Sequence, residues 1–168
     1  VKEGGFILGN PSASLKISVV SNPFCGYCKD AHLLLEKLVE EKRGELQVHI
    51  RFNYGGKNDK ELTELLTIFK NIYQNLGEKK FNEVLNYWYS TRDLDAVKHK
   101  YPFLDEIDLS DIIALSQDNA ENRLNFTPNL IINNWQFPKH YEREDILYFI
   151  EELLEDEDIV EEKEYQLA

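Results

Sequence analysis

The sequence predicts an α/β domain in which helices pack against a central sheet. Residues 15–20 alternate and then become β-branched, as in a strand, and residues 31–39 carry apolar side chains at every third and fourth position, as in an amphipathic helix. A second alternating run follows at 45–54. A strand, a helix and a strand in this order form a right-handed crossover between parallel strands. The length of 168 residues suits one substantial core, so we expect a single domain, residues 1–168.

The first quarter of the chain supplies the expected strands and their crossover helix. A short edge strand is expected at 6–8 and the first central strand at 12–20. The helix is expected to run from Cys25 to about Arg43. The strand at 45–54 is expected to place one face in the core, through Leu46, Val48, Ile50 and Phe52.

Residues 55–125 have helical periodicity and almost no strand signal, which predicts a helical insertion of about seventy residues. The last helix of this block is expected to be capped by Asp108 or Ser110. The positions expected to face inward in that helix are Ile113, Ala120 and Leu124. The aromatic cluster at 87–89, Tyr-Trp-Tyr, is expected in the core or along a groove.

The C-terminal quarter predicts a hairpin followed by a helix. Residues 129–132 and 135–137 are two apolar runs separated by two asparagines, a residue type that tolerates left-handed backbone and favours a two-residue turn. Residues 142–154 then show the spacing of an amphipathic helix. This helix is expected to close the domain.

Two cysteines, Cys25 and Cys28, are the only ones in the chain, and they lie at the junction between the first central strand and the crossover helix. The free N–H groups and the positive end of a helix dipole favour a negative charge there. Such a position can lower a thiol pKa from about 8.5 to roughly 3.5–7.5. Cys28, one turn further along, can reach the same sulfur and resolve a mixed disulfide. The pattern predicts a dithiol suited to disulfide exchange.

Three other interpretations of this cysteine pair are open. The cysteines could be small buried hydrophobes, although their spacing at a strand-to-helix junction argues against it. They could form a structural disulfide, which would add little stability because it closes a short loop. They could bind zinc, but two more ligands would be needed. The four histidines contain no pair at the spacing that completes a zinc finger: His32, His49, His99 and His140. We therefore expect no metal and no cofactor.

The charge of the chain restricts its partners. A net charge of −12 argues against nucleic-acid binding and against docking on anionic lipid. No apolar run approaches the length of a membrane span, so we expect no direct membrane insertion of this segment. The chain lacks methionine and begins at Val1, and we expect it to be part of a longer product that carried a signal sequence or a membrane domain.

Two motifs carry a family resemblance. Residues 22–29 read Asn-Pro-Phe-Cys-Gly-Tyr-Cys-Lys, and residues 126–128 read Phe-Thr-Pro, about a hundred positions later. Together they resemble the thioredoxin superfamily. Within it the chain is most similar to bacterial extracytoplasmic thiol-disulfide oxidoreductases of the Dsb type. It also resembles thioredoxin-like domains attached to vitamin K epoxide reductase-family membrane proteins.

The resemblance implies a thioredoxin fold, with a mixed central sheet, flanking helices and a helical insertion of the kind that Dsb-type proteins carry. It implies that Cys25 is the nucleophile and Cys28 the resolving thiol. Thr127 and a cis Pro128 are then expected to face the cysteines and to bind substrate as an added strand. The active-site loop would also include Pro23, Phe24, Gly26 and Tyr27.

The resemblance also implies partners and a compartment. Protein thiols and disulfides are the expected partners, together with a membrane redox partner of the vitamin K epoxide reductase type. The expected location is extracytoplasmic, in the bacterial periplasm, as the soluble part of a membrane-anchored protein.

One position departs from the family pattern. Relatives often bury an acidic residue six places before the first cysteine, and here that residue is Val19, which cannot accept a proton. Proton transfer from Cys28 must then depend on water or on another side chain. His32, one turn along the helix, is the first candidate, and Asp30 and Lys29 are alternatives.

Two functions follow from these observations. The favoured one is a thiol-disulfide oxidoreductase that acts on protein substrates. The alternative is a non-catalytic binding module or redox sensor with a thioredoxin fold, whose groove holds a peptide or partner. The direction of electron flow is left open, because it depends on the reduction potential relative to that of the compartment.

Overall fold

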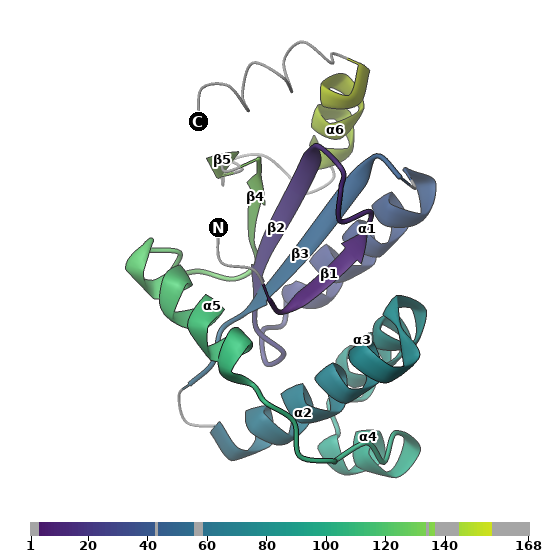
Figure 1. Cartoon of the computed structure of the whole chain (residues 1–168), viewed down its shortest axis with the longest axis vertical. Coiled ribbons are helices and arrows are strands. Elements are labelled where there is room, and N and C mark those ends of the chain that lie inside the picture. The colour runs from purple at the N-terminus through teal and green to yellow at the C-terminus, as the bar shows by residue number, and fades with distance from the viewer. Residues whose placement is uncertain (1–3, 43, 56–58, 134, 137–144, 156–168) are drawn as a thin grey trace.

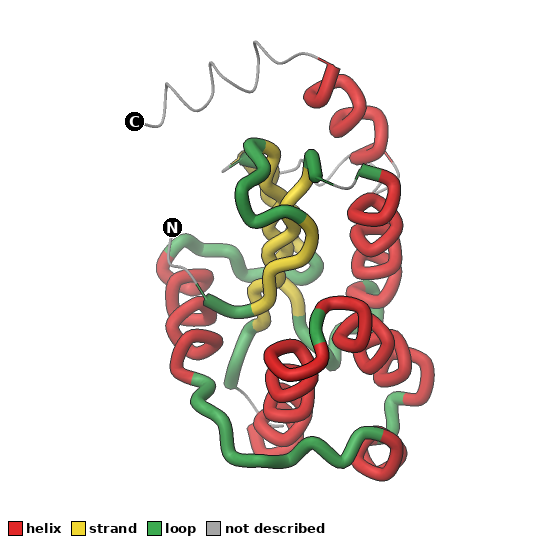
Figure 2. Tube along the Cα trace, turned by 45° about the vertical axis from the view of Figure 1, so that its right-hand side comes forward, coloured by secondary structure: helices red, strands yellow, loops and turns green. Residues whose placement is uncertain are grey.

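The fold is a five-stranded sheet with helices on both sides, seen in a computed structural model that describes residues 4–42, 44–55, 59–133, 135–136 and 145–155 (Figures 1 and 2). The elements in chain order are β1 (Phe6–Gly9), β2 (Leu15–Ser21), α1 (Cys28–Glu41), β3 (Leu46–Phe52), α2 (Asp59–Leu76), α3 (Glu78–Thr91), α4 (Leu94–Lys100), α5 (Ser110–Glu121), β4 (Asn129–Ile132), β5 (Trp135–Gln136) and α6 (Asp145–Glu155).

The sheet has the order β1-β3-β2-β4-β5 and is mixed. β2 and β3 are parallel, in register from Leu15 opposite Leu46 to Ser21 opposite Phe52, while β1, β4 and β5 pair with their neighbours in antiparallel fashion. The strand, crossover helix and parallel strand are therefore confirmed. This arrangement puts the C-terminal end of β2, where the cysteine loop begins, in the middle of the sheet.

The helical insertion is also confirmed, because α2 to α5 all lie between β3 and β4 in the sequence. In Figure 1, α2, α3 and α4 gather beyond one end of the sheet, and α6 lies near the other end. In Figure 2 helices flank the strands on two sides. That residues 1–168 form one domain, with 55–125 as its insertion, stays a prediction.

The core joins the insertion to the sheet through an aromatic cluster around Phe6 of β1. Its ring is stacked on Phe81 of α3, with centroids 4.6 Å apart and planes at 13°. The rings of Phe52 and Tyr73 meet the same ring edge-on, at 5.5 and 5.3 Å. Because Phe6 is 1% exposed, β1 is held by both the sheet and the insertion.

β3 differs from its prediction. Its apolar residues face the core as expected, but all seven residues of the strand are buried, including three polar ones on the other face: Gln47, His49 and Arg51. Helix α5 covers this second face, and the Arg51 guanidinium donates to the Asp118 carboxylate on α5. A polar strand face looks solvent-exposed in a sequence, and here it is buried, with at least one hydrogen bond made by the side chain of each of these three residues.

α5 also turns a different face to the sheet than predicted. Ile113 and Ala120, expected inward, are exposed. The buried residues of this helix are Ile112, Leu115 and Asn119. Asn119 donates to the side chain of Asn53 at 2.9 Å, and this polar contact, together with the Arg51–Asp118 pair, selects a face that apolar spacing alone does not identify.

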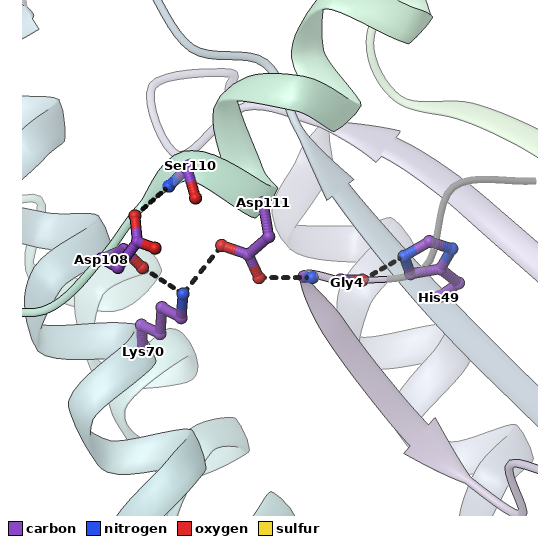
Figure 3. A network of polar contacts seen from close by, with 7 residues as sticks. Gly4, His49, Lys70, Asp108, Ser110 and Asp111 are labelled. Atoms are coloured by element: carbon purple, nitrogen blue, oxygen red, sulfur yellow. Dashed lines mark hydrogen bonds and ion pairs between the residues drawn. The ribbon is translucent and has the colours of Figure 1, made fainter.

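A polar network connects α2, the start of α5 and the residue before β1 (Figure 3). The Asp111 carboxylate accepts from the backbone N–H of Gly5 at 2.9 Å and from the Lys70 ammonium at 2.8 Å. Lys70, 8% exposed, also donates to the carbonyl of Asp108. The Asp108 carboxylate accepts from the N–H of Ser110, the first residue of α5. The cap position itself is occupied by Leu109, so the prediction that Asp108 or Ser110 caps this helix is wrong by one residue.

No helix in the described part of the chain combines the length and the apolar character needed to cross a membrane.

Candidate active site

The cysteine loop leaves β2 at Ser21 and enters α1 at Cys28. The prediction that α1 begins at Cys25 is therefore wrong by one turn. The reason is local: the Asn22 side chain accepts from the N–H of Phe24 at 2.9 Å, and the Asn22 carbonyl accepts from the N–H of Cys25 at 3.0 Å. These bonds, with Pro23 between them, hold residues 22–27 in turns ahead of the helix.

The Cys25 sulfur nevertheless meets the first N–H groups of the helix. Cys25 is half-buried, and burial alone raises the pKa of its thiol. Hydrogen bonds from the side chains of Thr127 and Cys28 and from the backbone N–H groups of Tyr27 and Cys28 outweigh burial. The pKa of Cys25 consequently lies below its ordinary value, which favours the nucleophilic thiolate.

The pKa of Cys28 is shifted in the opposite direction. Its side chain is 0% exposed, and burial is the largest of the effects that raise the pKa of its thiol to about 11. The neighbouring Cys25 adds to the increase through its hydrogen bond and its charge, while bonds from the Asn22 backbone and the Ser21 hydroxyl oppose it. The pair thus contains one half-buried sulfur with a lowered pKa and one buried sulfur with a raised pKa.

Ser21 links Cys28 to His32. Its hydroxyl, 0% exposed, bonds to the Cys28 sulfur and lies 2.7 Å from Nε2 of His32. The His32 ring is 4% exposed and stacks on Tyr89, with centroids 5.5 Å apart, and burial lowers the pKa of His32 to about 3. His32 is therefore a neutral imidazole held in the core, and it contacts Cys28 through Ser21. Ser21 was missed by sequence reasoning because it lies in the strand, before the motif.

The Thr127–Pro128 segment lies against Cys25. The Cys25 thiol donates to the Thr127 carbonyl over 3.5 Å, across 102 residues of sequence. The Thr127–Pro128 peptide bond is cis, as the resemblance implies. The two motifs that the sequence singled out are thus neighbours in space.

Three side chains near the end of α3 bind the carbonyl groups of the cysteine loop. The Trp88 indole N–H donates to Pro23 at 2.8 Å, and the Tyr89 hydroxyl donates to Asn22 at 3.2 Å. The guanidinium of Arg92, the residue that ends α3, donates to Pro23 at 2.7 Å and to Cys25 at 3.0 Å. Trp88 and Tyr89 belong to the aromatic cluster at 87–89 that was expected in the core or along a groove, and both are buried.

Arg92 was also missed by sequence reasoning. It stands between the end of α3 and the cap residue of α4, and no local pattern connects it to a loop 67 residues earlier.

The loop is open on its outer side. Tyr27, between the cysteines, is 70% exposed, and no atom lies within 4 Å of the position that a side chain at Gly26 would take. A cavity of about 690 Å³ opens beside the loop, with Phe24, Trp88 and Arg92 among the residues that line it. The Phe24 ring meets the Trp88 indole edge-on, at 5.6 Å. A polypeptide can therefore approach Cys25 from solvent.

Among the residues that the structure describes, no three or more His, Cys, Asp and Glu side chains come together as metal ligands would.

Comparison with known proteins agrees with this geometry. A family model described as thioredoxin matches residues 2–152, and no curated protein matches the chain. Several solved structures share its fold, among them the following three. A periplasmic thioredoxin-like protein from Salmonella enterica serovar Typhimurium is 17% identical, with a TM-score of 0.69 over 88% of each chain. The catalytic domain of Proteus mirabilis ScsC is 18% identical, also with 0.69 over 88% of each chain. Oxidised BdbD from Bacillus subtilis is 12% identical, with 0.65 over 89% of this chain and 92% of that one.

Proposed function

The chain belongs to the thioredoxin family and carries the Cys-x-x-Cys pair of a thiol-disulfide oxidoreductase; from this premise we propose that it exchanges disulfides with protein substrates. Cys25 is the nucleophile and Cys28 the resolving thiol. The observation that carries this assignment is the contrast between the two sulfurs. The pKa of half-buried Cys25 is lowered by converging hydrogen bonds, whereas burial raises that of Cys28 to about 11.

In the reducing direction, the Cys25 thiolate attacks one sulfur of a substrate disulfide. The substrate S–S bond breaks, a mixed disulfide forms at Cys25, and the other substrate sulfur leaves as a thiolate. Cys28 then attacks the Cys25 sulfur and releases the second substrate sulfur. A Cys25–Cys28 disulfide forms as the bond between Cys25 and the substrate breaks, and two electrons pass from the cysteine pair to the substrate. The two released substrate sulfurs take the Cys28 proton and one proton from water, which replaces the proton that Cys25 lost on ionising. The oxidising direction is the reverse.

The second attack needs an ionised Cys28, and Ser21 is suited to assist it. A hydroxyl that donates to a thiolate stabilises it, and the Ser21 hydroxyl is in contact with the Cys28 sulfur. We propose that His32 acts through Ser21, whose oxygen lies 2.7 Å from Nε2. In the tautomer that carries its hydrogen on Nε2, the ring donates to that oxygen and leaves the hydroxyl hydrogen to point toward sulfur. With its pKa lowered to about 3, His32 is a poor proton acceptor, so we assign it this orienting role in place of direct proton transfer.

Substrate binding is assigned to Thr127 and Pro128, with Pro23, Phe24, Gly26 and Tyr27 forming the rest of the contact surface. The Thr127 carbonyl lies 3.5 Å from the Cys25 sulfur, within reach of a peptide that has a cysteine at the site. Pairing through the main chain tolerates varied side chains, which suits an enzyme that acts on several proteins. No cofactor is needed for this chemistry.

The proposed location is outside the cytoplasm, in the bacterial periplasm, where disulfides persist. The related fold from Salmonella enterica is described as periplasmic, which supports this proposal. A membrane redox partner of the vitamin K epoxide reductase type is proposed from the motif resemblance. A Cys28→Ser variant of the full-length protein, expressed in its own cells, would retain such a partner as a mixed disulfide for identification by mass spectrometry.

Insulin reduction with a dithiol as electron donor tests the main proposal. We expect wild-type protein to accelerate reduction, Cys25→Ser to be inactive, and Cys28→Ser to accumulate a mixed disulfide. If the wild type and Cys25→Ser behave alike in both reduction and oxidation of a protein substrate, the chain is the binding module or sensor that the sequence left as the alternative.

A further inference from the structure

The cysteine loop is held by a single arginine at two points. Arg92 donates through one guanidinium nitrogen to the Pro23 carbonyl at 2.7 Å and through the other to the Cys25 carbonyl at 3.0 Å. The backbone N–H of Cys25 in turn donates to the Asn22 carbonyl at 3.0 Å. Both backbone groups of the proposed nucleophile are therefore bound, and Arg92 supplies the bond on the side of Gly26 and Tyr27.

The backbone at Arg92 does not by itself favour an arginine. Arg92 ends α3 in the left-handed region, with φ of 51° and ψ of 29°, a conformation in which glycine and asparagine are the preferred residues. What arginine adds is its planar fork of donors, which can bind two carbonyl oxygens at once. The guanidinium also lies 4.8 Å from the centre of the Tyr89 ring, which helps to fix its direction.

We propose that Arg92 is a positioning residue for disulfide exchange: by holding the carbonyl groups of Pro23 and Cys25, it keeps the loop in its reactive conformation and sets the balance between dithiol and disulfide. The helical insertion, through α3, thereby controls the redox site. This inference rests on the proposed role of Cys25.

The physical reason is that the Cys25 thiolate is stabilised by several hydrogen bonds that must all point at the same sulfur atom. The N–H groups of Tyr27 and Cys28 bond to the Cys25 sulfur only while residues 25–28 keep their turn. Without Arg92, the Pro23 carbonyl would keep only its bond from the Trp88 indole and the Cys25 carbonyl would bond to water, so the turn would sample other conformations. The reduced form would then lose stabilisation of its thiolate, and the equilibrium would move toward the disulfide.

Arg92→Gly removes the side chain without straining the backbone, because glycine suits the left-handed conformation at least as well as arginine. The chain offers a matched control in Arg123→Gly: Arg123 is also left-handed, with φ of 58°, is exposed, and is not among the groups that bind loop 22–27. Arg92→Lys is the conservative variant, since an ammonium keeps the charge and lacks the planar fork.

For each variant, the pKa of Cys25 would be measured from the pH dependence of its alkylation, and the dithiol–disulfide equilibrium by titration against glutathione. We expect Arg92→Gly to raise the pKa of Cys25 and to shift the equilibrium constant roughly tenfold toward the disulfide, which is about 30 mV for this two-electron couple. Arg92→Lys should lie between it and the wild type, and Arg123→Gly should match the wild type.

Equal Cys25 pKa values and potentials in Arg92→Gly and Arg123→Gly would overturn the proposal, even if Arg92→Gly unfolds at a lower temperature, because that loss would be merely structural. If Arg92→Gly does not fold, Arg92→Asn, also tolerated in the left-handed region, decides by the same two readouts. The outcome is distinct from failure of the proposed function, which would appear as absent turnover in the wild type.

Discussion

Removing the Ser21 hydroxyl should slow the second step of exchange and leave the first unchanged. In Ser21→Ala, the Cys28 sulfur loses its bond to a buried hydroxyl, and His32 loses the partner 2.7 Å from its Nε2. A hydrogen bond to a charged group contributes about 1.5–3 kcal/mol, which corresponds to roughly a tenfold to hundredfold slower attack by Cys28. The unpartnered imidazole should also lower the free energy of unfolding by about 1–3 kcal/mol.

Rapid acid quenching of a reaction with a disulfide-containing peptide would measure both steps. Ser21→Ala should form the mixed disulfide at Cys25 at the wild-type rate and should resolve it slowly. Ser18→Ala is the matched control, since Ser18 lies on the same strand and is only half-buried. The reasoning is refuted if Ser21→Ala resolves the mixed disulfide as fast as the wild type, or if Ser18→Ala slows resolution to the same extent.

Further predictions concern stability. Phe6→Ala should lower the free energy of unfolding by about 3–5 kcal/mol in denaturant titration, because its buried ring joins the sheet to the insertion, and a loss below about 1 kcal/mol would contradict that role. Asp111→Asn should lower it by about 1–3 kcal/mol, because it leaves the buried Lys70 ammonium without its carboxylate partner; an unchanged transition would show that this pair adds nothing. Between pH 6.5 and about 3, unfolded chains bind a proton at His32 that the folded protein excludes. Folded stability should therefore fall with decreasing pH in this window, by up to about 1.4 kcal/mol per unit, and this component should vanish in His32→Asn but persist in a variant of exposed His99.

The helices and strands whose form is determined by residues close together in the sequence could be predicted. The periodicity of 15–20 and 31–39 located the strand and helix that flank the cysteines, and the helical periodicity of 55–125 located the insertion. The conformation of the cysteine loop was harder to predict. Asn22 stops the helix from starting at Cys25 by a bond between its side chain and Phe24, a choice that helical spacing does not encode.

Contacts between distant residues could not be predicted. The burial of Arg51 could not be predicted, because its partner, Asp118, lies 67 residues away on a helix whose inward face differs from the predicted one. Ser21 and Arg92 share this property: each acts on the cysteine loop through tertiary contacts. Neither residue belongs to a motif, so only the folded arrangement connects them with the chemistry.

The central claim is that the Cys25 thiol ionises more readily than a free cysteine, beside a buried Cys28 with a raised pKa. It is tested most directly by alkylation of the reduced protein as a function of pH, with the modified residue identified by mass spectrometry. The account predicts that Cys25 reacts with a pKa below that of a free cysteine, about 8.5, while Cys28 stays unmodified until strongly alkaline pH. Equal reactivity of the two cysteines, or a Cys25 that ionises like a free thiol, would contradict it.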